Sequence, residues 1–187
     1  QDMQHDLPGR GLLTGLRRGE ILALQWPDVD LVAGKLDIRT ALTRIDGELV
    51  EKDTKTHQMR LISIDPATVE LLTEHRARYE QRAKHLGIKP SKNAWLFSYA
   101  AANDEPLKPD TVSQRYGTMC ARLGINTHLH ALRHYSATSL LTAGTDVRTV
   151  AGRLGHGGGG ATTLRVYAAW VEKAHQDAAK LIAIQLP

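Results

Sequence analysis

The stretch TGLRRGEILALQW, residues 14–26, combines a glycine turn, a pair of arginines and a run of apolar side chains. The apolar spacing predicts a helix over residues 15–25 with one buried face. Trp26 and Pro27 end this helix, because the residue before a proline avoids the α conformation. The predicted buried face consists of Ile21, Leu22 and Leu24.

Charged side chains at the start of this helix predict an anion-binding site. Arg17 lies near the first turn, where free backbone N–H groups and a guanidinium together attract phosphate. Glu20 follows three residues later on the same face and can orient Arg17. An ordinary capped surface helix would show the same pattern, so these residues alone do not establish an anion-binding site.

Outward from this segment the sequence predicts a mostly α chain with a small antiparallel β-sheet, an α+β fold. Residues 35–64 are rich in strand formers, with about three strands and a hairpin turn at Asp46-Gly47. Residues 90–109 are irregular, with a short buried strand or anchor at Trp95, Leu96 and Phe97. Helices are expected from Pro66 to Gly87, from Pro109 to Gly124, and over residues 130–143, 147–154, 161–170 and 172–184. The inward side of the helix that begins at Pro109 is predicted to hold Val112, Tyr116, Met119, Cys120 and Leu123.

Length and composition narrow the class of protein. The 187 residues suit one domain, which at this size buries roughly 70% of its unfolded surface. Apolar residues make up 42% and charged residues 24%, so a disordered chain is excluded. No window approaches roughly 18 consecutive apolar residues, and the first six residues are unlike a secretory signal. The single cysteine, Cys120, excludes a disulfide framework and favours a reducing compartment.

Positive charge is concentrated in the second half of the chain. The net charge of +4 alone is weak evidence for a nucleic-acid partner. Residues 111–170, however, contain six arginines and four histidines against one acid, Asp146, which gives a net charge of +5. This excess fits a polyanion partner and equally fits a solvated basic face.

Two further motifs supply side chains that bind phosphate or transfer protons. Lys55, in the hairpin region, is a mobile point charge and proton donor, although Lys52 lies in the same region. His130 and Arg133 are three residues apart on one predicted helix face. Imidazole can pass a proton near neutral pH, and guanidinium can grip a phosphate with two hydrogen bonds. Each motif by itself also fits an ordinary polar surface.

A fourth motif, Leu154-Gly155-His156 with Tyr167 eleven residues later, completes an order and spacing that resemble the tyrosine recombinases, the phage-integrase family. The resemblance covers nearly the whole chain, from about residue 13 to residue 170. Residues 14–26 look like the first arginine box of that family, HALRH at 130–134 looks like its His-x-x-Arg box, and His156 and Tyr167 look like its final histidine and its nucleophile.

The resemblance implies a fold similar to a tyrosine recombinase catalytic domain and a covalent mechanism on DNA. Tyr167 would attack a phosphodiester and form a 3′-phosphotyrosyl bond, from which a 5′-hydroxyl later rejoins a strand. Arg17 and Arg133 would grip the non-bridging oxygens and stabilise the charge of the transition state. The two transfers conserve bond energy, and cations act on the phosphate, so neither ATP nor a metal or other cofactor is implied.

The same resemblance assigns the supporting roles. Lys55 would protonate the leaving 5′-oxygen, and His130 would act as a general acid or base. His156 would hydrogen-bond the phosphate, and Glu20 would orient Arg17. Further DNA contacts are expected from Arg18, Arg153 and Arg165.

The implied activity is site-specific recombination for the integration or excision of a phage or another mobile element. The implied partners are duplex DNA and further copies of the chain, assembled on DNA as a homo-oligomer, a tetramer. The implied location is the cytoplasm of a prokaryote, in association with DNA. A final helix over residues 172–184 is expected to dock on a neighbouring subunit.

The sequence departs from the family pattern at its start. Residues 1–12 form an atypical polar segment where the family carries an apolar helix, and the family's separate N-terminal DNA-clamping (core-binding) domain is expected to be absent. Residues 13–187 are assigned to the catalytic domain. The interval between His156 and Tyr167 is slightly long, and the four glycines at 157–160 are expected to absorb it as a loop.

Three alternatives accompany this interpretation. The chain could be a truncated DNA-binding remnant without autonomous recombination, although a pure binder does not need Tyr167. A type IB topoisomerase uses the same tyrosine, arginine and histidine chemistry. A zinc site built from His128, His130 and His134 is disfavoured, because only the last two share a helix face and no acid or thiol completes the ligand set.

Overall fold

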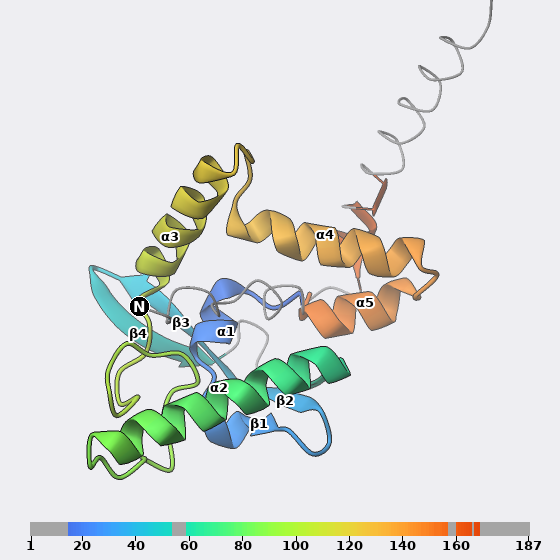
Figure 1. Ribbon diagram of the computed structural model, residues 1–187. Coiled ribbons are helices and arrows are strands. Elements are labelled where there is room, and N and C mark those ends of the chain that lie inside the picture. The colour runs from blue at the N-terminus through green and yellow to red at the C-terminus, as the bar shows by residue number, and fades with distance from the viewer. Residues whose placement is uncertain (1–14, 54–58, 157–159, 166, 169–187) are drawn as a thin grey trace, which may run out of the picture.

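The computed structural model describes residues 15–53, 59–156, 160–165 and 167–168 of the 187-residue chain. Helices and strands follow one another as α1 (Arg18–Leu22), η3 (Trp26–Asp28), β1 (Val29–Asp30), β2 (Lys35–Ile38), β3 (Thr40–Ile45), β4 (Glu48–Asp53), β5 (Arg60–Ser63), α2 (Pro66–His85), α3 (Pro109–Arg122), α4 (Leu129–Thr142) and α5 (Val147–Leu154). Figure 1 shows α1 in the middle of the molecule, with α4 and α5 on one side and α2 with β1 and β2 on the other. The mostly α fold with small antiparallel sheets is therefore confirmed.

The helix predicted over residues 15–25 is wrong in length, because α1 covers only Arg18–Leu22. Gly15 has a φ of +81°, outside the right-handed helical region, so the helix cannot start there. Arg17 is the extended N-cap, with φ −71° and ψ 147°. After the helix, Gln25 forms an isolated antiparallel bridge with Trp95, which confirms the buried anchor expected in the irregular region.

The predicted β region forms two small sheets instead of one. Strand β2 pairs with β1 on one side and with β5 on the other, and β3 pairs separately with β4. The hairpin turn at Asp46-Gly47 is confirmed, with φ of 50° and 88°, the left-handed backbone that a tight two-residue hairpin requires. The sequence pattern located the strands, but it held no signal for which strands pair.

The helices after the sheets agree closely with the sequence. Helix α5 covers residues 147–154 as predicted, and Asp146 caps it by accepting hydrogen bonds from the backbone N–H groups of Arg148 and Thr149. The inward placement of Met119 and Leu123 on α3 is wrong, since their side chains are 47% and 65% exposed. The buried residues of that helix are Pro109, Val112 and Cys120. The helical segment expected at 161–170 is described at residues 161–165 and 167–168, and the helix expected at 172–184 lies outside the described residues.

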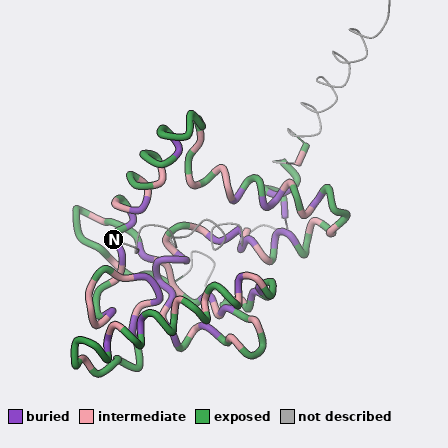
Figure 2. The backbone as a smooth tube through the Cα atoms, viewed as in Figure 1, coloured by how far each residue is buried: buried purple, intermediate pink, exposed green. Residues whose placement is uncertain are grey.

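Two apolar clusters hold the described part together. The larger cluster joins α1, the three-stranded sheet, α2 and the anchor around Leu96. Figure 2 shows the buried segments concentrated around α1 and the strands beside it. The smaller cluster joins α4 to α5 through Ala137, Leu141, Val150 and Leu154. Within the described ranges no helix is both long and apolar enough to cross a bilayer.

Candidate active site

Arg17 is held at the start of α1 by a buried carboxylate. Its backbone N–H donates to Glu20 Oε2 at 2.8 Å, and its Nη1 donates to Glu20 Oε1 at 2.8 Å. Its Nη2 donates to the carbonyl oxygen of Gly155 at 2.9 Å, across 138 residues of chain. Glu20 is only 2% exposed, whereas the Arg17 side chain is 37% exposed. The predicted pair is therefore formed, and it leaves part of the guanidinium open to a ligand.

Arg133 approaches the same place from α4. It is 4% exposed, and its Nη1 and Nη2 donate to the carbonyl oxygens of Gly15 and Leu154, both at 2.6 Å. Burial, followed by the nearby charge of Arg17, lowers the pKa of Arg133 to about 10. The guanidinium thus stays cationic at neutral pH, in a position where its charge is poorly solvated and an anion would relieve it.

The residue at position 15 has to be glycine for this arrangement. Its φ of +81° lies in the left-handed region, and an added Cβ would come within 2.6 Å of Leu154 Cδ2. The close approach lets the Gly15 carbonyl reach Arg133 while the chain turns into α1. The Gly15-Leu16-Arg17 segment therefore connects the first arginine to the second one directly.

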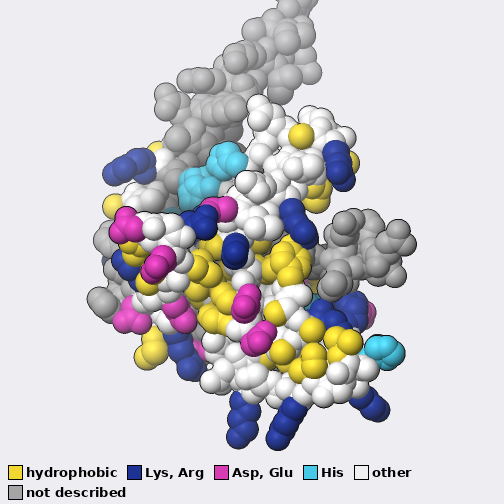
Figure 3. All heavy atoms as spheres, turned by 90° about the vertical axis from the view of Figure 1, so that its left-hand side faces the viewer, with side chains coloured by type: hydrophobic (Ala, Val, Ile, Leu, Met, Phe, Trp, Pro, Cys, Tyr) yellow, Lys and Arg dark blue, Asp and Glu magenta, His cyan; other side chains and the backbone are white. Residues whose placement is uncertain are grey.

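A hollow of about 490 Å³ opens between α1, α3 and the start of α4. Among its lining residues are Arg17, Arg133 and His130, with Ser113 and Tyr116 on the α3 side and His128 before α4. On the face shown in Figure 3, histidine side chains gather next to Lys and Arg side chains, above an apolar area. A hollow of this size and cationic lining suits a phosphodiester.

The surroundings of His130 favour its neutral imidazole form, because they lower the pKa of the ring. Its pKa is lowered by burial first, and then by the charges of His134, Arg133, His128 and Arg17. The ring of His134 contacts it edge-on, with ring centroids 4.6 Å apart. A neutral imidazole beside two guanidiniums can accept a proton during a reaction.

His156 follows directly after α5, and the end of that helix sets its position. The Gly155 N–H donates to Gly152 and the His156 N–H donates to Ala151, the two hydrogen bonds of a Schellman motif. The His156 Nδ1 lies 2.8 Å from Oγ1 of the fully buried Thr163. Burial first, and then the charges of Arg133 and Arg17, lower the pKa of His156 to about 4.

Tyr167 comes from the helical segment that follows the four glycines at residues 157–160 in the sequence. Its half-buried side chain packs against the α4–α5 cluster, as do those of Val147 and Leu140. Tyr167 is not among the described residues that line the hollow. The structure therefore brings Arg17, Arg133 and His130 together around the hollow, with Glu20 bound to Arg17, and packs Tyr167 against the apolar cluster between α4 and α5.

The remaining predicted residues have different settings. Arg18 donates to Ser113 Oγ at 2.5 Å and to the Pro109 carbonyl at 3.3 Å, so that it links α1 to α3. Arg153 Nη1 donates to the Ser63 carbonyl at 2.9 Å, while Arg165 is exposed. Lys55 lies outside the described residues.

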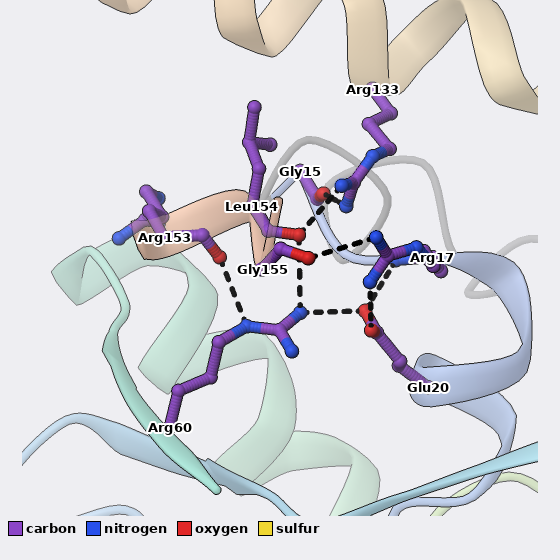
Figure 4. Close-up of polar contacts among 8 residues, drawn as sticks. All are labelled: Gly15, Arg17, Glu20, Arg60, Arg133, Arg153, Leu154 and Gly155. Atoms are coloured by element: carbon purple, nitrogen blue, oxygen red, sulfur yellow. Dashed lines mark hydrogen bonds and ion pairs between the residues drawn. The ribbon is translucent and has the colours of Figure 1, made fainter. Parts of the chain in front are cut away.

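Sequence reasoning missed Arg60, the first residue of β5. Its side chain is 10% exposed, and its Nη2 lies 2.7 Å from Glu20 Oε2. Its Nε donates to the Arg153 carbonyl at 3.2 Å, and its Nη2 lies 3.5 Å from the Leu154 carbonyl oxygen. Figure 4 shows the guanidiniums of Arg17, Arg60 and Arg133 converging on the end of α5. An arginine that opens an edge strand carries no sequence signal for such contacts.

Glu20 is ionised between two of these guanidiniums. Burial raises its pKa, but hydrogen bonds from Arg60 and Arg17 and the charge of Arg60 outweigh burial, and the net pKa is lowered.

As for the zinc alternative, the described part of the chain contains no group of three or more His, Cys, Asp or Glu side chains able to hold a metal ion.

Comparisons with known proteins identify the family of the chain and related folds. The profile of the phage integrase family matches residues 11–173. The ICEBs1 integrase of Bacillus subtilis (strain 168) is 35% identical over 157 residues, which cover 83% of this chain and 42% of that protein. A structure of the Tn1549 transposon integrase in complex with transposon right end DNA has a TM-score of 0.69 at 23% identity, covering 91% of this chain and 56% of that one. The XerA recombinase crystal structure has a TM-score of 0.62 at 24% identity, covering 88% and 54%. The chain spans about two fifths of the length of the curated relatives it matches first.

Proposed function

The chain belongs to the phage integrase family, and from this premise we propose that it cuts and rejoins duplex DNA through a covalent bond to Tyr167. The observation that carries the proposal is the pair of guanidiniums, Arg17 and Arg133, at one hollow beside the neutral imidazole of His130. We assign residues 13–187 to the catalytic domain of such a recombinase.

In the proposed reaction one phosphodiester is exchanged for another. The Tyr167 oxygen attacks the scissile phosphorus, its proton passes to His130, and the bond from phosphorus to the 5′-oxygen breaks. Lys55 donates the proton that the leaving 5′-oxygen takes up. Attack by a 5′-hydroxyl on the 3′-phosphotyrosyl bond then reverses these transfers and joins a strand, so no external energy source is consumed.

The two arginines stabilise the negative charge that builds on the non-bridging oxygens. Their side chains are fixed by backbone carbonyls and by Glu20 before a substrate arrives, so little reorganisation is needed at the moment of reaction. His156, with one ring nitrogen engaged by Thr163, is assigned to hydrogen-bond the phosphate. His156 and His130 are both mainly neutral near pH 7, and a bound phosphate would raise the pKa of each.

Duplex DNA is the proposed substrate, and a mobile element is the proposed biological context. The excess of positive charge over residues 111–170 supports a polyanion. The Tn1549 integrase, whose fold is similar, was solved with transposon DNA. We assign Arg18, Arg153 and Arg165 to DNA backbone contacts, and a tetramer on DNA to the active assembly.

A covalent-trapping assay tests this proposal. The protein is mixed with nicked duplexes drawn from DNA flanking its gene, and the products are separated in SDS. We expect an SDS-resistant protein–DNA band that is lost in Tyr167→Phe and kept in Tyr135→Phe, a change at an exposed tyrosine of α4. Salt-sensitive DNA binding without any covalent band would indicate a DNA-binding remnant. Relaxation of supercoiled plasmid without strand exchange would indicate an activity of the topoisomerase kind.

A further inference from the structure

The end of α5 holds three guanidiniums through three consecutive carbonyl groups. Arg60 Nε donates to the Arg153 carbonyl at 3.2 Å, and Arg133 Nη2 donates to the Leu154 carbonyl at 2.6 Å. Arg17 Nη2 donates to the Gly155 carbonyl at 2.9 Å. The last carbonyls of a helix have no partner within the helix and carry its negative partial charge, which makes them natural acceptors for cations. Figure 4 shows this convergence.

Arg60 differs from the other two in what it can reach. Arg17 and Arg133 line the hollow, and Arg60 is not among the described residues that do so. Its side chain is 10% exposed and is turned to the buried carboxylate of Glu20, with Nη2 2.7 Å from Oε2. Arg60 therefore lies behind the phosphate-facing arginines, where a substrate cannot contact it.

Glu20 links Arg60 to Arg17. Its Oε2 accepts from Arg60 Nη2 and from the backbone N–H of Arg17, and its Oε1 accepts from Arg17 Nη1. Since Glu20 is 2% exposed, water cannot replace a lost partner. Without Arg60, the carboxylate loses one of its two charged partners and keeps only its hydrogen bonds from Arg17, so Glu20 and the Arg17 guanidinium are fixed less firmly.

Gly155 supplies a second, independent observation. An added Cβ at this position would lie 2.6 Å from both Cζ and Nη1 of Arg60. The guanidinium of Arg60 thus lies flat against the backbone at the residue whose carbonyl receives Arg17. The glycine in Leu-Gly-His leaves room for Arg60 as well as allowing the left-handed turn, for which φ is +64°.

We propose that Arg60 is a positioning residue, which fixes the guanidinium of Arg17 for the transition state through Glu20 and the carbonyl end of α5. This inference rests on the proposed strand-transfer function of the hollow. Arg60 itself does not touch the DNA. Its removal therefore slows the chemical step and leaves DNA affinity nearly unchanged.

The first test measures single-turnover cleavage of a nicked duplex by Arg60→Met, with DNA affinity measured in parallel. Misplacing a reacting group by about 1 Å costs on the order of 100-fold in rate, so a loss of about 10- to 100-fold is expected, with a Kd changed by less than about threefold. Arg60→Lys keeps the charge but cannot reach both Glu20 and the Arg153 carbonyl, and it should recover only part of the rate. Arg39→Met, at an arginine with 53% of its side chain exposed, is the matched control and should cleave normally.

A double-mutant cycle separates positioning from general structural damage. If Arg60 acts through Arg17, then Arg60→Met added to Arg17→Ala should slow cleavage no further. Losses that multiply would overturn the proposal. Rates are compared well below the melting temperature of each variant, and Arg60→Lys answers the question if Arg60→Met does not fold.

A readout that needs no cleavage keeps this inference separable from the proposed function. In 15N NMR spectra of the full chain, a held guanidinium gives distinct Nη resonances because its rotation is slow. We expect such resonances for Arg17 in the wild type and in Arg39→Met, and their collapse in Arg60→Met. If no DNA is ever cleaved, the proposed function fails while this spectrum still decides the role of Arg60. Unchanged Arg17 resonances in Arg60→Met would overturn the positioning role.

Discussion

Replacing Gly155 by alanine should destabilise the protein, because the new methyl group would clash with Arg60 at the end of α5. The residue has a φ of +64°, and the new Cβ would lie 2.6 Å from two guanidinium atoms of Arg60. Gly87, which follows α2, has a φ of +66° and nothing within 4 Å of an added Cβ. The two glycines thus share the backbone conformation and differ in the contact, so Gly87→Ala is a matched control.

The expected losses follow from this comparison. Alanine in the left-handed conformation costs about 1 kcal/mol, and both variants carry this cost. Gly155→Ala must in addition push Arg60 away from Glu20, in a pair whose side chains are 10% and 1% exposed. Breaking a buried ion pair costs about 3–5 kcal/mol, and partial displacement should cost about 2 kcal/mol. We therefore expect losses of about 3 kcal/mol for Gly155→Ala and about 1 kcal/mol for Gly87→Ala.

Urea unfolding followed by circular dichroism measures both free energies, and thermal unfolding provides a second estimate. For a chain of this size, 1 kcal/mol corresponds to about 2–4 °C, so the melting temperatures should fall by roughly 9 °C and roughly 3 °C. Adding Arg60→Met to Gly155→Ala should remove most of the difference, because the contact no longer exists. Equal losses for the two glycines would refute the idea that Arg60 is packed against Gly155.

Three further expectations concern charge. The unfolded chain protonates His156 near pH 6.5 and the native chain only near pH 4, so the stability that the neutral ring contributes is complete above pH 6.5 and is lost as the pH falls toward 4. Urea unfolding across this window should show that the free energy of unfolding falls less with decreasing pH in His156→Gln than in the wild type. An identical fall in the two proteins would contradict the shifted pKa. Glu20→Gln leaves two guanidiniums without their buried counter-charge and should reduce the free energy of unfolding by about 3 kcal/mol, measured against Glu80→Gln on the exposed face of α2. DNA affinity measured by fluorescence anisotropy should fall steeply between about 50 and 200 mM salt, and a slope near zero would argue against phosphate contacts.

Local rules predicted the parts of the fold that local chemistry determines. Asp146 and Gly155 mark the ends of α5, because an N-cap carboxylate and a left-handed glycine act within one helical turn. Asp46-Gly47 marks the hairpin for the same reason. The start of α1 was predicted too early, because Gly15 turns toward Arg133, a contact 118 residues away that periodicity cannot reveal.

In the candidate site, too, contacts between residues close in sequence were predictable and contacts between distant residues were not. Arg17 with Glu20 and His130 with Arg133 were predictable, because each pair lies three residues apart on one helical turn. Arg60 was not, since it meets Glu20 across 40 residues and the end of α5 across 93. The DNA contact of Arg18 stays a prediction, and the hydrogen bond from Arg18 to Ser113 joins two helices whose pairing has no signal in the sequence.

The most direct test of the account identifies the atom that joins protein to DNA. The covalent complex trapped on a nicked duplex is digested with protease and nuclease, and the nucleotide-linked peptide is sequenced by tandem mass spectrometry. The account predicts a single adduct on Tyr167, linked through a 3′-phosphate and absent from Arg17→Ala and Arg133→Ala. An adduct on Tyr116 or Tyr135, or a link through a 5′-phosphate, would contradict it.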